Sequence, residues 1–254
     1  MKKILNKVLV VIPAYNEEGA ILGVVKEMEE KCPDVNYIVI NDCSTDKTEE
    51  ILTKNKIKHL THEKNKGLFG TMTTGFKYAL ENNFEAVIQV DGDGQHDPSE
   101  IEKVVRIWKE KELDFIQGSR FIEAKKPRTA RMFGSRVIAF AMLMVLGKKI
   151  KDPTNGMRLY GTELIERFAN NPKLHPEPDT IAYLIKDKYK FEEVQVIVRE
   201  RETGESYLTS FRIIKYMTKT VSHLVFKVPF MKKPHKKQLK KEKKQLKREK
   251  KLNK

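Results

Sequence analysis

Short apolar runs rich in β-branched residues alternate along this chain with longer amphipathic segments. The short runs have the length and composition of buried strands, and they lie at residues 8–12, 37–40, 86–88 and 114–117. In the segments between them apolar residues recur at helical spacing, which predicts helices at about residues 17–31, 47–55, 69–81 and 98–111. This alternation predicts an α/β fold with a mostly parallel, doubly wound sheet and helices on both faces.

Polar residues follow each of these strands. They are Asn16, Glu17, Asp42, Asp91, Asp93 and Arg120. The carboxyl ends of parallel strands meet at one edge of a sheet, where such folds bind ligands, so we expect these residues to line one rim. No G-x-G-x-x-G follows the first strand, which disfavours a dinucleotide enzyme.

The stretch after the third strand carries the densest candidate chemistry. Asp91 and Asp93 are two residues apart, and extended residues at that spacing point to the same side. Converging carboxylates repel each other, and a divalent cation with oxygen ligands (magnesium, manganese or calcium) removes that penalty. Gln95 adds an amide oxygen, while Gly92 and Gly94 allow a phosphate to approach the backbone. The pattern predicts a metal–diphosphate site.

Two other interpretations fit the same stretch. An acidic, glycine-rich segment after a strand can be only a solvated turn. A calcium-binding loop would use Asp91, Asp93 and Glu102 at positions one, three and twelve. His96 replaces the glycine needed at position six, and Pro98 interrupts the loop, so the calcium loop is disfavoured.

Several motifs in order resemble one enzyme family. They occupy residues 11–18, 41–48, 65–67, 91–96 and 118–120. Together they resemble glycosyltransferase family 2, whose members are inverting enzymes with the GT-A nucleotide-diphospho-sugar fold. Residues 95–96, 152–158 and 201–206 add a likeness to its polyprenyl-phosphate glycosyltransferases, the branch of the dolichol-phosphate mannose synthases. The resemblance spans roughly residues 8 to 210.

The resemblance implies roles for individual residues. The nucleotide-sugar would be bound by Pro13, Ala14, Tyr15, Glu17, Asp42, Gly67 and Asp91, and Mg²⁺ or Mn²⁺ by Asp91, Asp93 and Gln95. Tyr15 could instead be packed at a strand end, and Asp42 could be a turn or cap residue. Cys43 stands where a glycine is usual, and Tyr207 where the mannose synthases carry lysine, which favours a uridine over a guanosine donor.

The acceptor decides whether a base is needed. A sugar hydroxyl requires one, whereas a polyprenyl phosphate is already ionised and needs cations to position it. The residues expected at this phosphate are Arg120, Arg131, Ser135, Arg158, Arg201 and Ser206, and Arg199 is a further candidate. Asp152 could be a base, a structural cap or an arginine partner. The catalytic candidates are Asp91, Asp93, Arg120 and Arg158; transfer to a hydroxyl of a surface polysaccharide or glycolipid is the alternative.

Charge and apolar segments point to a membrane surface. Net charge is +15, and residues 232–254 carry thirteen Lys/Arg and two Glu, so the tail holds 13 − 2 = +11. The longest uncharged run, 137–147, is too short to span a bilayer. Residues 132–146 and 208–231 could lie in the membrane interface, or both could instead pack onto the domain core.

We therefore expect a transferase domain at 1–207, an interfacial segment at 208–231 and a polybasic tail at 232–254. The enzyme would be cytoplasmic and peripherally attached to the anionic inner face of the cell membrane. Only two cysteines are present, which agrees with a reduced compartment. A small membrane protein partner is compatible with this interpretation. A basic protein that binds nucleic acid is the remote alternative, disfavoured because no aromatic residues interleave the tail.

Overall fold

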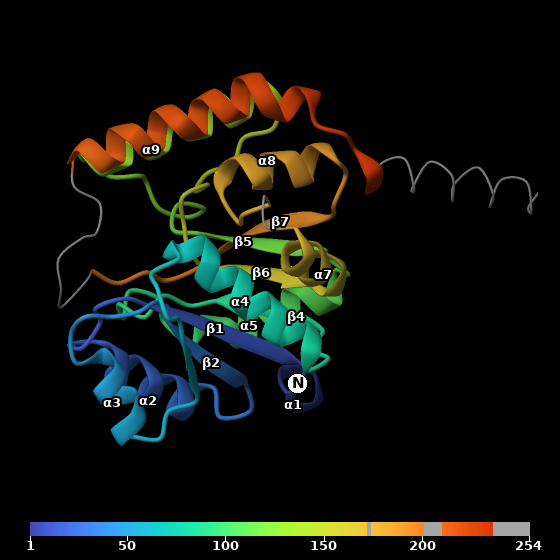
Figure 1. The fold of residues 1–254 in the computed structure, drawn as a ribbon. Helices are drawn as coiled ribbons and strands as arrows, with labels where there is room; N and C mark the ends of the chain where they lie inside the picture. The colour runs from blue at the N-terminus through green and yellow to red at the C-terminus, as the bar shows by residue number, and fades with distance from the viewer. Residues whose placement is uncertain (172–173, 201–209, 236–254) are drawn as a thin grey trace, which may run out of the picture.

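The structure is a computed structural model that describes residues 1–171, 174–200 and 210–235 (Figure 1). Seven strands of the described residues form one sheet in the order β3-β2-β1-β4-β6-β5-β7. Their bounds are β1 Val8–Ala14, β2 Asn36–Asn41, β3 His59–Thr61, β4 Ala86–Gln89, β5 Phe115–Ser119, β6 Arg158–Gly161 and β7 Phe191–Gln195. All neighbouring pairs are parallel except β4–β6 and β5–β6. The predicted α/β fold with a mostly parallel sheet is confirmed.

Helices cover both faces of the sheet. The helices are α1 Lys2–Leu5, α2 Ile21–Lys31, α3 Thr48–Lys54, α4 Gly67–Glu81, α5 Glu100–Glu110, α6 Ala130–Leu146, α7 Thr162–Asn170, α8 Pro178–Lys186 and α9 Ser210–Ser222. One core cluster joins the sheet to α2, α3 and α5; a second joins its other face to α4, α6, α7 and α8. Both faces of β1 are therefore buried, which explains its continuous apolar sequence.

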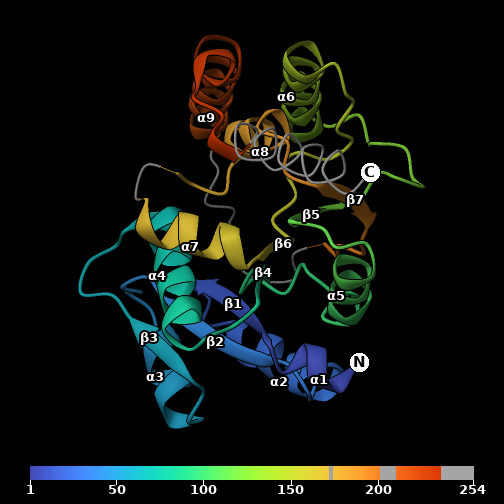
Figure 2. The ribbon, with the colours of Figure 1, turned by 90° about the vertical axis from the view of Figure 1, so that its right-hand side faces the viewer.

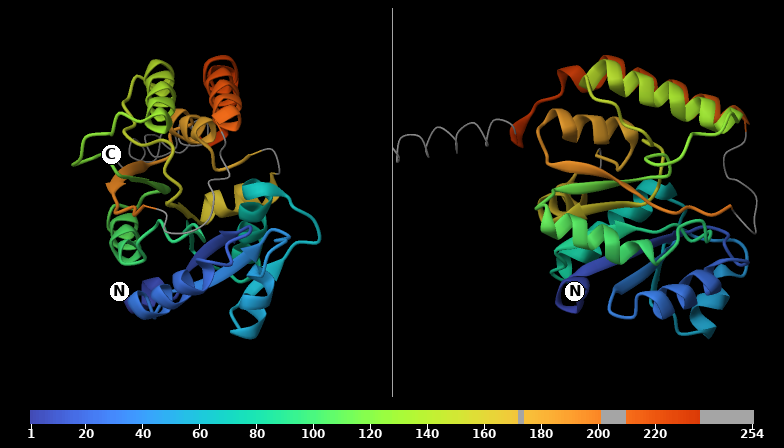
Figure 3. Two further views of the ribbon diagram at one scale, coloured as in Figure 1. Left: turned by 90° about the vertical axis from the view of Figure 1, so that its left-hand side faces the viewer. Right: turned by 180° about the vertical axis from the view of Figure 1, so that it is seen from behind.

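An outer layer lies beyond the second face. Helix α9 packs against α6 and α8, and it continues into a π-helical turn, η1 His223–Lys227, and a 3₁₀ turn, η2 Val228–Phe230. Figures 2 and 3 show α6 and α9 side by side above α8. Leu224 and Val228 are buried in this contact, so one side of the layer belongs to the core.

The second helix, α2, begins four residues later than its apolar pattern predicts. The backbone N–H of Glu17 donates to Oγ1 of Thr48 at 2.9 Å, and that of Glu18 donates to Oδ2 of Asp46 at 3.1 Å. These hydrogen bonds use the N–H groups of the first predicted turn for contacts with residues 46–48, so that turn does not join the helix. The predicted start at residue 17 is therefore wrong, while the predicted end at Lys31 is confirmed.

Candidate active site

The strand register places the predicted polar residues at one edge of the sheet. Asp42 follows β2, Asp91 follows β4 and Arg120 follows β5, three parallel strands. Strand β6 runs in the opposite direction, and its first residue Arg158 pairs with Gln117 near the end of β5. Both motif loops that flank β5 and β6 therefore reach the same edge as the acidic stretch.

The loops after β1 and β2 are joined by side-chain to backbone hydrogen bonds. Asn16 N–H donates to Oγ of Ser44 at 3.0 Å, and the N–H of Thr45 donates to Oδ1 of Asn16 at 2.8 Å. Asn16 and Cys43 both have positive φ, of 54° and 60°, so each loop turns sharply beside the other. These contacts fix the shape of the rim beside Tyr15, whose ring is 36% exposed.

Asp42 is buried and connects the end of β2 to residues 65–67, the N-K-G loop. Its Oδ1 accepts from Nδ1 of His62 at 2.7 Å and from the N–H of Lys66 at 2.8 Å. Its Oδ2 accepts from the N–H of Gly67 at 2.7 Å. The carboxylate is thus more than a turn residue, because it brings the segment that starts α4 to the strand edge. Sequence reasoning missed His62, which no motif identified.

The acidic stretch lies beyond the strand. Strand β4 ends at Gln89, and Asp93 sits in a turn beside Gly94, whose φ is +77°. The alternation of extended residues on which the predicted convergence rested therefore does not apply here. Asp93 is 8% exposed and its Oδ1 accepts from the N–H of Gln95 at 3.0 Å. This turn, and not the pleat of a strand, sets the direction of the Asp93 carboxylate.

Asp91 is held from both sides. Its Oδ1 accepts from Nε2 of Gln89 at 2.7 Å, and its backbone N–H donates to Nδ1 of His96 at 3.0 Å. Oδ2 lies 3.8 Å from the same ring nitrogen. Because Nδ1 accepts from the backbone, it has no proton to give to Oδ2 in the neutral ring. Among the described residues, Oδ2 receives no hydrogen bond.

The loop of residues 152–156, with the sequence Asp-Pro-Thr-Asn-Gly (the D-P-T-N-G loop), packs directly against the Asp91 carboxylate. A β-carbon built at Gly156 would lie 2.6 Å from Oδ2 of Asp91 and 3.0 Å from Cε1 of His96. A β-carbon at Gly92 would similarly lie 2.9 Å from the carbonyl oxygen of Pro13. Glycine at these positions lets the motif loops pack closely against one another, and the close approach of a phosphate to Gly92 stays a prediction.

Arg158 is buried and faces oxygens of the protein. Its Nε donates to Oε1 of Gln117 at 2.7 Å, and its other two nitrogens donate to the carbonyls of Pro153 and Pro176. It therefore joins the D-P-T-N-G loop to β5 and to the segment before α8, and its contact with a phosphate stays a prediction. Nearby, burial raises the pKa of the Glu177 carboxyl to about 7, with a smaller contribution from Asp179.

Arg120 and Asp152 form a bidentate ion pair. Nε and one terminal nitrogen of Arg120 donate to Oδ2 and Oδ1 of Asp152 at 2.7 and 2.9 Å, and the N–H of Arg120 also donates to Oδ2. Asp152 is fully buried; burial acts to raise its pKa, but the hydrogen bonds and charge of Arg120 outweigh this and lower it. Of the three predicted roles for Asp152, the structure shows the arginine partner.

Arg199, which follows β7, contacts the acidic stretch through Gln95. Nε2 of the Gln95 side chain donates to the backbone carbonyl of Arg199, and the backbone N–H of Arg199 donates to the backbone carbonyl of Gln95 at 2.7 Å. The Arg199 guanidinium contacts Glu27 and Asp97 at 2.7 and 2.6 Å, and hydrogen bonds to these carboxylates raise its pKa. Arg199, a candidate phosphate contact in the sequence, is thus paired with carboxylates.

Comparison with known proteins now identifies the family. Residues 9–168 match the family described as Glycosyl transferase family 2. The chain belongs to this family of glycosyltransferases. The UDP-N-acetylglucosamine–dolichyl-phosphate N-acetylglucosaminyltransferase of Methanococcus voltae is 29% identical over 180 residues, or 63% of this chain and 71% of that protein. The polyprenol monophosphomannose synthase of Mycolicibacterium smegmatis is 27% identical over 227 residues, covering 84% and 85% of the two chains.

Solved structures agree on the architecture. Glucosyl-3-phosphoglycerate synthase from Mycobacterium tuberculosis, solved with Mn²⁺, UDP and phosphoglyceric acid, matches with a TM-score of 0.65 at 16% identity. The match covers 91% of this chain and 82% of that one. The fold of this family 2 glycosyltransferase is the GT-A fold that its motifs predicted.

A cationic cluster of this glycosyltransferase was missed in the sequence. Nζ of Lys126 donates to Oγ of Ser135 at 2.9 Å, and Ser135 Oγ lies 2.9 Å from Oγ1 of Thr154. Arg136 donates to the backbone carbonyl of Lys126 at 2.6 Å. Lys126 lies in a polar loop without periodicity, so only its neighbours in space single it out. Arg201, Ser206 and Tyr207, and the side chain of Arg131, lie outside the described residues.

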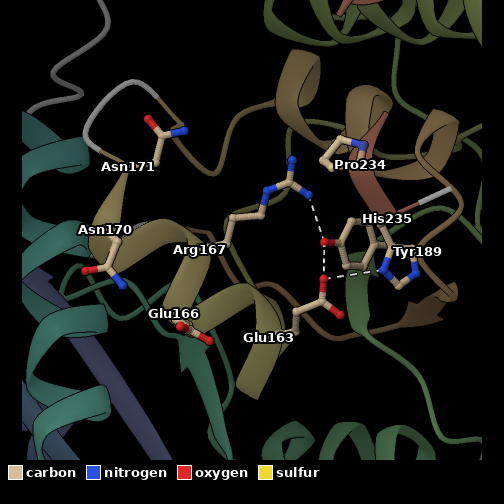
Figure 4. A pocket seen from close by; sticks show the side chains of 8 residues that line it. All are labelled: Glu163, Glu166, Arg167, Asn170, Asn171, Tyr189, Pro234 and His235. Carbon is tan, nitrogen blue, oxygen red and sulfur yellow. Dashed lines mark hydrogen bonds and ion pairs between the residues drawn. The ribbon is translucent and has the colours of Figure 1, made fainter. Parts of the chain in front are cut away.

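A pocket of about 390 Å³ lies at the opposite edge of the sheet (Figure 4). It is lined by α7, which starts where Gly161 pairs with Ala86, the first residue of β4. Arg167 donates to the hydroxyl of Tyr189 at 2.8 Å, that hydroxyl donates to Glu163, and His235 lies 3.3 Å from the same carboxylate. Tyr189 connects Arg167 to Glu163, and His235 lies beside the same carboxylate, so these charges are engaged with one another, away from the acidic stretch.

Proposed function

We propose that this glycosyltransferase moves a sugar from a nucleotide-diphospho-sugar to a polyprenyl phosphate, with inversion at the anomeric carbon. The observation that carries the proposal is the set of charged side chains next to Asp91 at the carboxyl edge of the sheet. There the one carboxylate considered as a base, Asp152, is bound by Arg120. The ammonium of Lys126 contacts the hydroxyl of Ser135, which in turn contacts the hydroxyl of Thr154. Such a rim suits an acceptor that is already an anion.

The relatives support the same acceptor class. The printed names of the Methanococcus voltae and Mycolicibacterium smegmatis proteins specify a dolichyl-phosphate acceptor and a polyprenol monophosphomannose product. In the proposed reaction, an oxygen of the acceptor phosphate forms a bond to the anomeric carbon as the bond to the donor diphosphate breaks. The nucleoside diphosphate leaves, and no proton has to be removed from the attacking phosphate oxygen.

A divalent ion fits the acidic stretch. In the described residues no group of three His, Cys, Asp or Glu side chains could hold a metal by itself. Magnesium-type sites commonly combine one or two carboxylates with substrate phosphates, and Oδ2 of Asp91 is an acceptor that receives no described hydrogen bond. Asp91, Asp93 and Gln95 would hold Mg²⁺ or Mn²⁺, which when bound neutralises the charge of the departing diphosphate.

The hydrogen bonds of Asp42 support a uridine donor. A carboxylate has about four lone-pair positions, and both on Oδ1 are used by His62 and Lys66. Gly67 uses one on Oδ2, which leaves one position for a base in the described environment. The single N3–H of uracil needs one such position, whereas the adjacent N1–H and N2–H of guanine would need both oxygens. We therefore propose UDP-sugars as donors.

The outer layer supports attachment to a membrane. On α6, Phe133, Phe140 and Met144 are 64, 64 and 70% exposed, and on η1 and η2 Phe226 and Phe230 are 74 and 83% exposed. The exposed Lys227 lies in η1, and the exposed Lys148, Lys149 and Lys232 follow within three residues of the ends of α6 and η2. In the described part of the chain, no helix combines the length and apolar character of a bilayer span. We propose that this layer lies on the anionic cytoplasmic face of a membrane, next to the acceptor lipid.

The decisive experiment is transfer from labelled nucleotide sugars with Mn²⁺ and undecaprenyl phosphate in non-ionic detergent. We expect a lipid-linked, acid-labile product from a UDP-sugar, abolished by EDTA and by Asp93→Asn. If the label enters only hydroxyl acceptors, the proposed polyprenyl phosphate acceptor is wrong. Equal binding of UDP and GDP in calorimetry would remove the proposed base preference.

Vesicle flotation tests the proposed membrane layer. We expect Phe226→Ser with Phe230→Ser to lower binding to phosphatidylglycerol vesicles, because both rings are among the most exposed in the described chain. Leu60→Ser, at a 40% exposed leucine on the edge strand β3, is the matched control. Equal flotation of both variants would remove η1 and η2 from the membrane contact.

A further inference from the structure

Lys126 is held in a defined position although it lies in a loop. Its Nζ donates to Oγ of Ser135 at 2.9 Å and lies 5.1 Å from the ring centre of Phe121. The same ring carries the guanidinium of Arg120 at 5.0 Å. Arg136 fixes the Lys126 backbone by donating to its carbonyl oxygen. A lysine ordered by three neighbours, Ser135, Phe121 and Arg136, differs from a solvated surface lysine such as the adjacent, exposed Lys125.

The charge of Lys126 is not matched by a carboxylate. The charged groups that act on it are Arg120 after β5, Arg136 on α6, Asp152 in the D-P-T-N-G loop and Glu193 on β7. Asp152 is engaged by Arg120, and Glu193 accepts from the N–H groups of Lys151 and Asp152 at 2.9 Å. In the described residues no carboxylate forms an ion pair with Lys126. One of its three N–H donors is used by Ser135, and an anion can take the others.

The D-P-T-N-G loop relates this position to the metal stretch. Thr154 contacts Ser135, and Gly156, two residues further on, contacts the Asp91 carboxylate. Two residues of chain span at most about 7 Å. The same short loop therefore contacts both the hydroxyl of Ser135 and the carboxylate proposed to face the donor diphosphate. An anion bound at Lys126, Ser135 and Thr154 lies at the neighbouring part of the same rim, where an attacking phosphate is needed.

We propose that the ammonium of Lys126, together with the hydroxyls of Ser135 and Thr154, binds the phosphate group of the acceptor. The proposal rests on the proposed function, which supplies the acceptor, and adds a ligand that the motifs do not contain. Arg120 stays paired with Asp152 and contributes its charge from its place over the Phe121 ring.

Direct binding tests the proposal without requiring turnover. A ten-carbon prenyl phosphate in non-ionic micelles is titrated by calorimetry into the full chain and into Lys126→Met, which keeps the length of the side chain and removes its charge. Loss of a charge-assisted hydrogen bond predicts binding weaker by about tenfold to hundredfold. Lys125→Met, at the exposed neighbour, is the control and should bind as the wild type does. Unchanged binding by Lys126→Met, or no binding by the wild type, overturns the proposal.

A second arm separates the acceptor from lipid headgroups. Binding to phosphatidylglycerol vesicles that lack prenyl phosphate should not change in Lys126→Met. A loss confined to these vesicles would assign the lysine to headgroups and overturn the proposal. If binding is lost in Lys126→Met but the wild type transfers no sugar to the bound prenyl phosphate, the proposed function fails while this site stands.

The pH dependence distinguishes binding from a structural role. Burial, followed by the charges of Arg120 and Arg136, lowers the pKa of Lys126 and outweighs Asp152 and Glu193. Prenyl phosphate affinity should therefore fall as pH rises through this lowered pKa, because the neutral amine no longer attracts an anion. Lys126→Arg should retain binding and lose this alkaline fall, and it replaces Lys126→Met if that variant does not fold. An identical pH profile in both proteins would overturn the proposal.

Discussion

Replacing Gly156 by alanine should disable the reaction without unfolding the protein. The added β-carbon would lie 2.6 Å from Oδ2 of Asp91, whereas ordinary contact begins at 3.4 Å, so the carboxylate or the loop must retreat by 3.4 − 2.6 = 0.8 Å. A misplacement of about 1 Å at a reacting group lowers a rate roughly 100-fold. Gly156 does not have positive φ, so alanine meets no backbone strain, and the free energy of unfolding should change by less than about 1 kcal/mol.

The assay combines sugar transfer at saturating donor with urea unfolding. Gly23→Ala is the matched control, because a β-carbon at Gly23 in α2 meets nothing within 4 Å. This control should keep the wild-type kcat and gain about 0.5–1 kcal/mol from the better helix propensity of alanine. A Gly156→Ala protein with wild-type kcat would refute the packing of the D-P-T-N-G loop against a working carboxylate.

Three further outcomes follow from the same contacts. Asp152→Asn leaves Arg120 without its buried partner and should lower the free energy of unfolding by about 3 kcal/mol in urea at pH 7. Because the pKa of Asp152 is lowered in the fold, this difference is present above its unfolded pKa and should shrink as pH falls through the folded value; a constant difference would contradict the pairing. Glu177→Gln should gain up to about 3 kcal/mol relative to wild type between pH 5 and pH 8, because a carboxyl with pKa near 7 destabilises the fold as it ionises; parallel stability curves would show that Glu177 is solvated. UDP binding in calorimetry should weaken at least tenfold in EDTA, and equal binding with and without Mn²⁺ would remove the metal from the donor site.

The sequence predicted the central strands because burial on both faces leaves a strong local signal. The predicted runs at 8–12 and 86–88 lie within β1 and β4, where nearly every side chain is buried. Strand β6 carried no such signal, since Arg158 to Gly161 is short and starts with a buried arginine. Its antiparallel direction depends on pairing with β4 and β5, which local pattern does not encode. The late start of α2 likewise depends on hydrogen bonds to a distant loop.

Among the predicted site residues that the structure describes, Asp42, Asp91, Arg120 and Arg158 share one sheet edge, but their individual contacts could not be predicted. Arg120 and Arg158 carry the same charge in neighbouring motifs, yet one pairs with a carboxylate and the other with backbone carbonyls. Lys126 and His62 are unremarkable in sequence, and their contacts with Ser135 and Asp42 are visible only in the fold. Side-chain pairing between loops decides which of many polar residues remain available, and only the fold brings those loops together.

Strand β5 ends at Ser119, and the antiparallel β6 begins at Arg158, which pairs with Gln117, so residues 120–157 leave the sheet and return to it at neighbouring positions. An excursion closed in this way can be replaced as a unit without changing the register of any other strand pair. It contains α6, Lys126, Ser135 and the D-P-T-N-G loop, whereas the loops around Tyr15 and Asp42 lie outside it. Chimeras between family members with junctions at residues 119 and 158 would thus exchange the proposed acceptor site as a cassette, and gene recombination could diversify the acceptor independently of the donor.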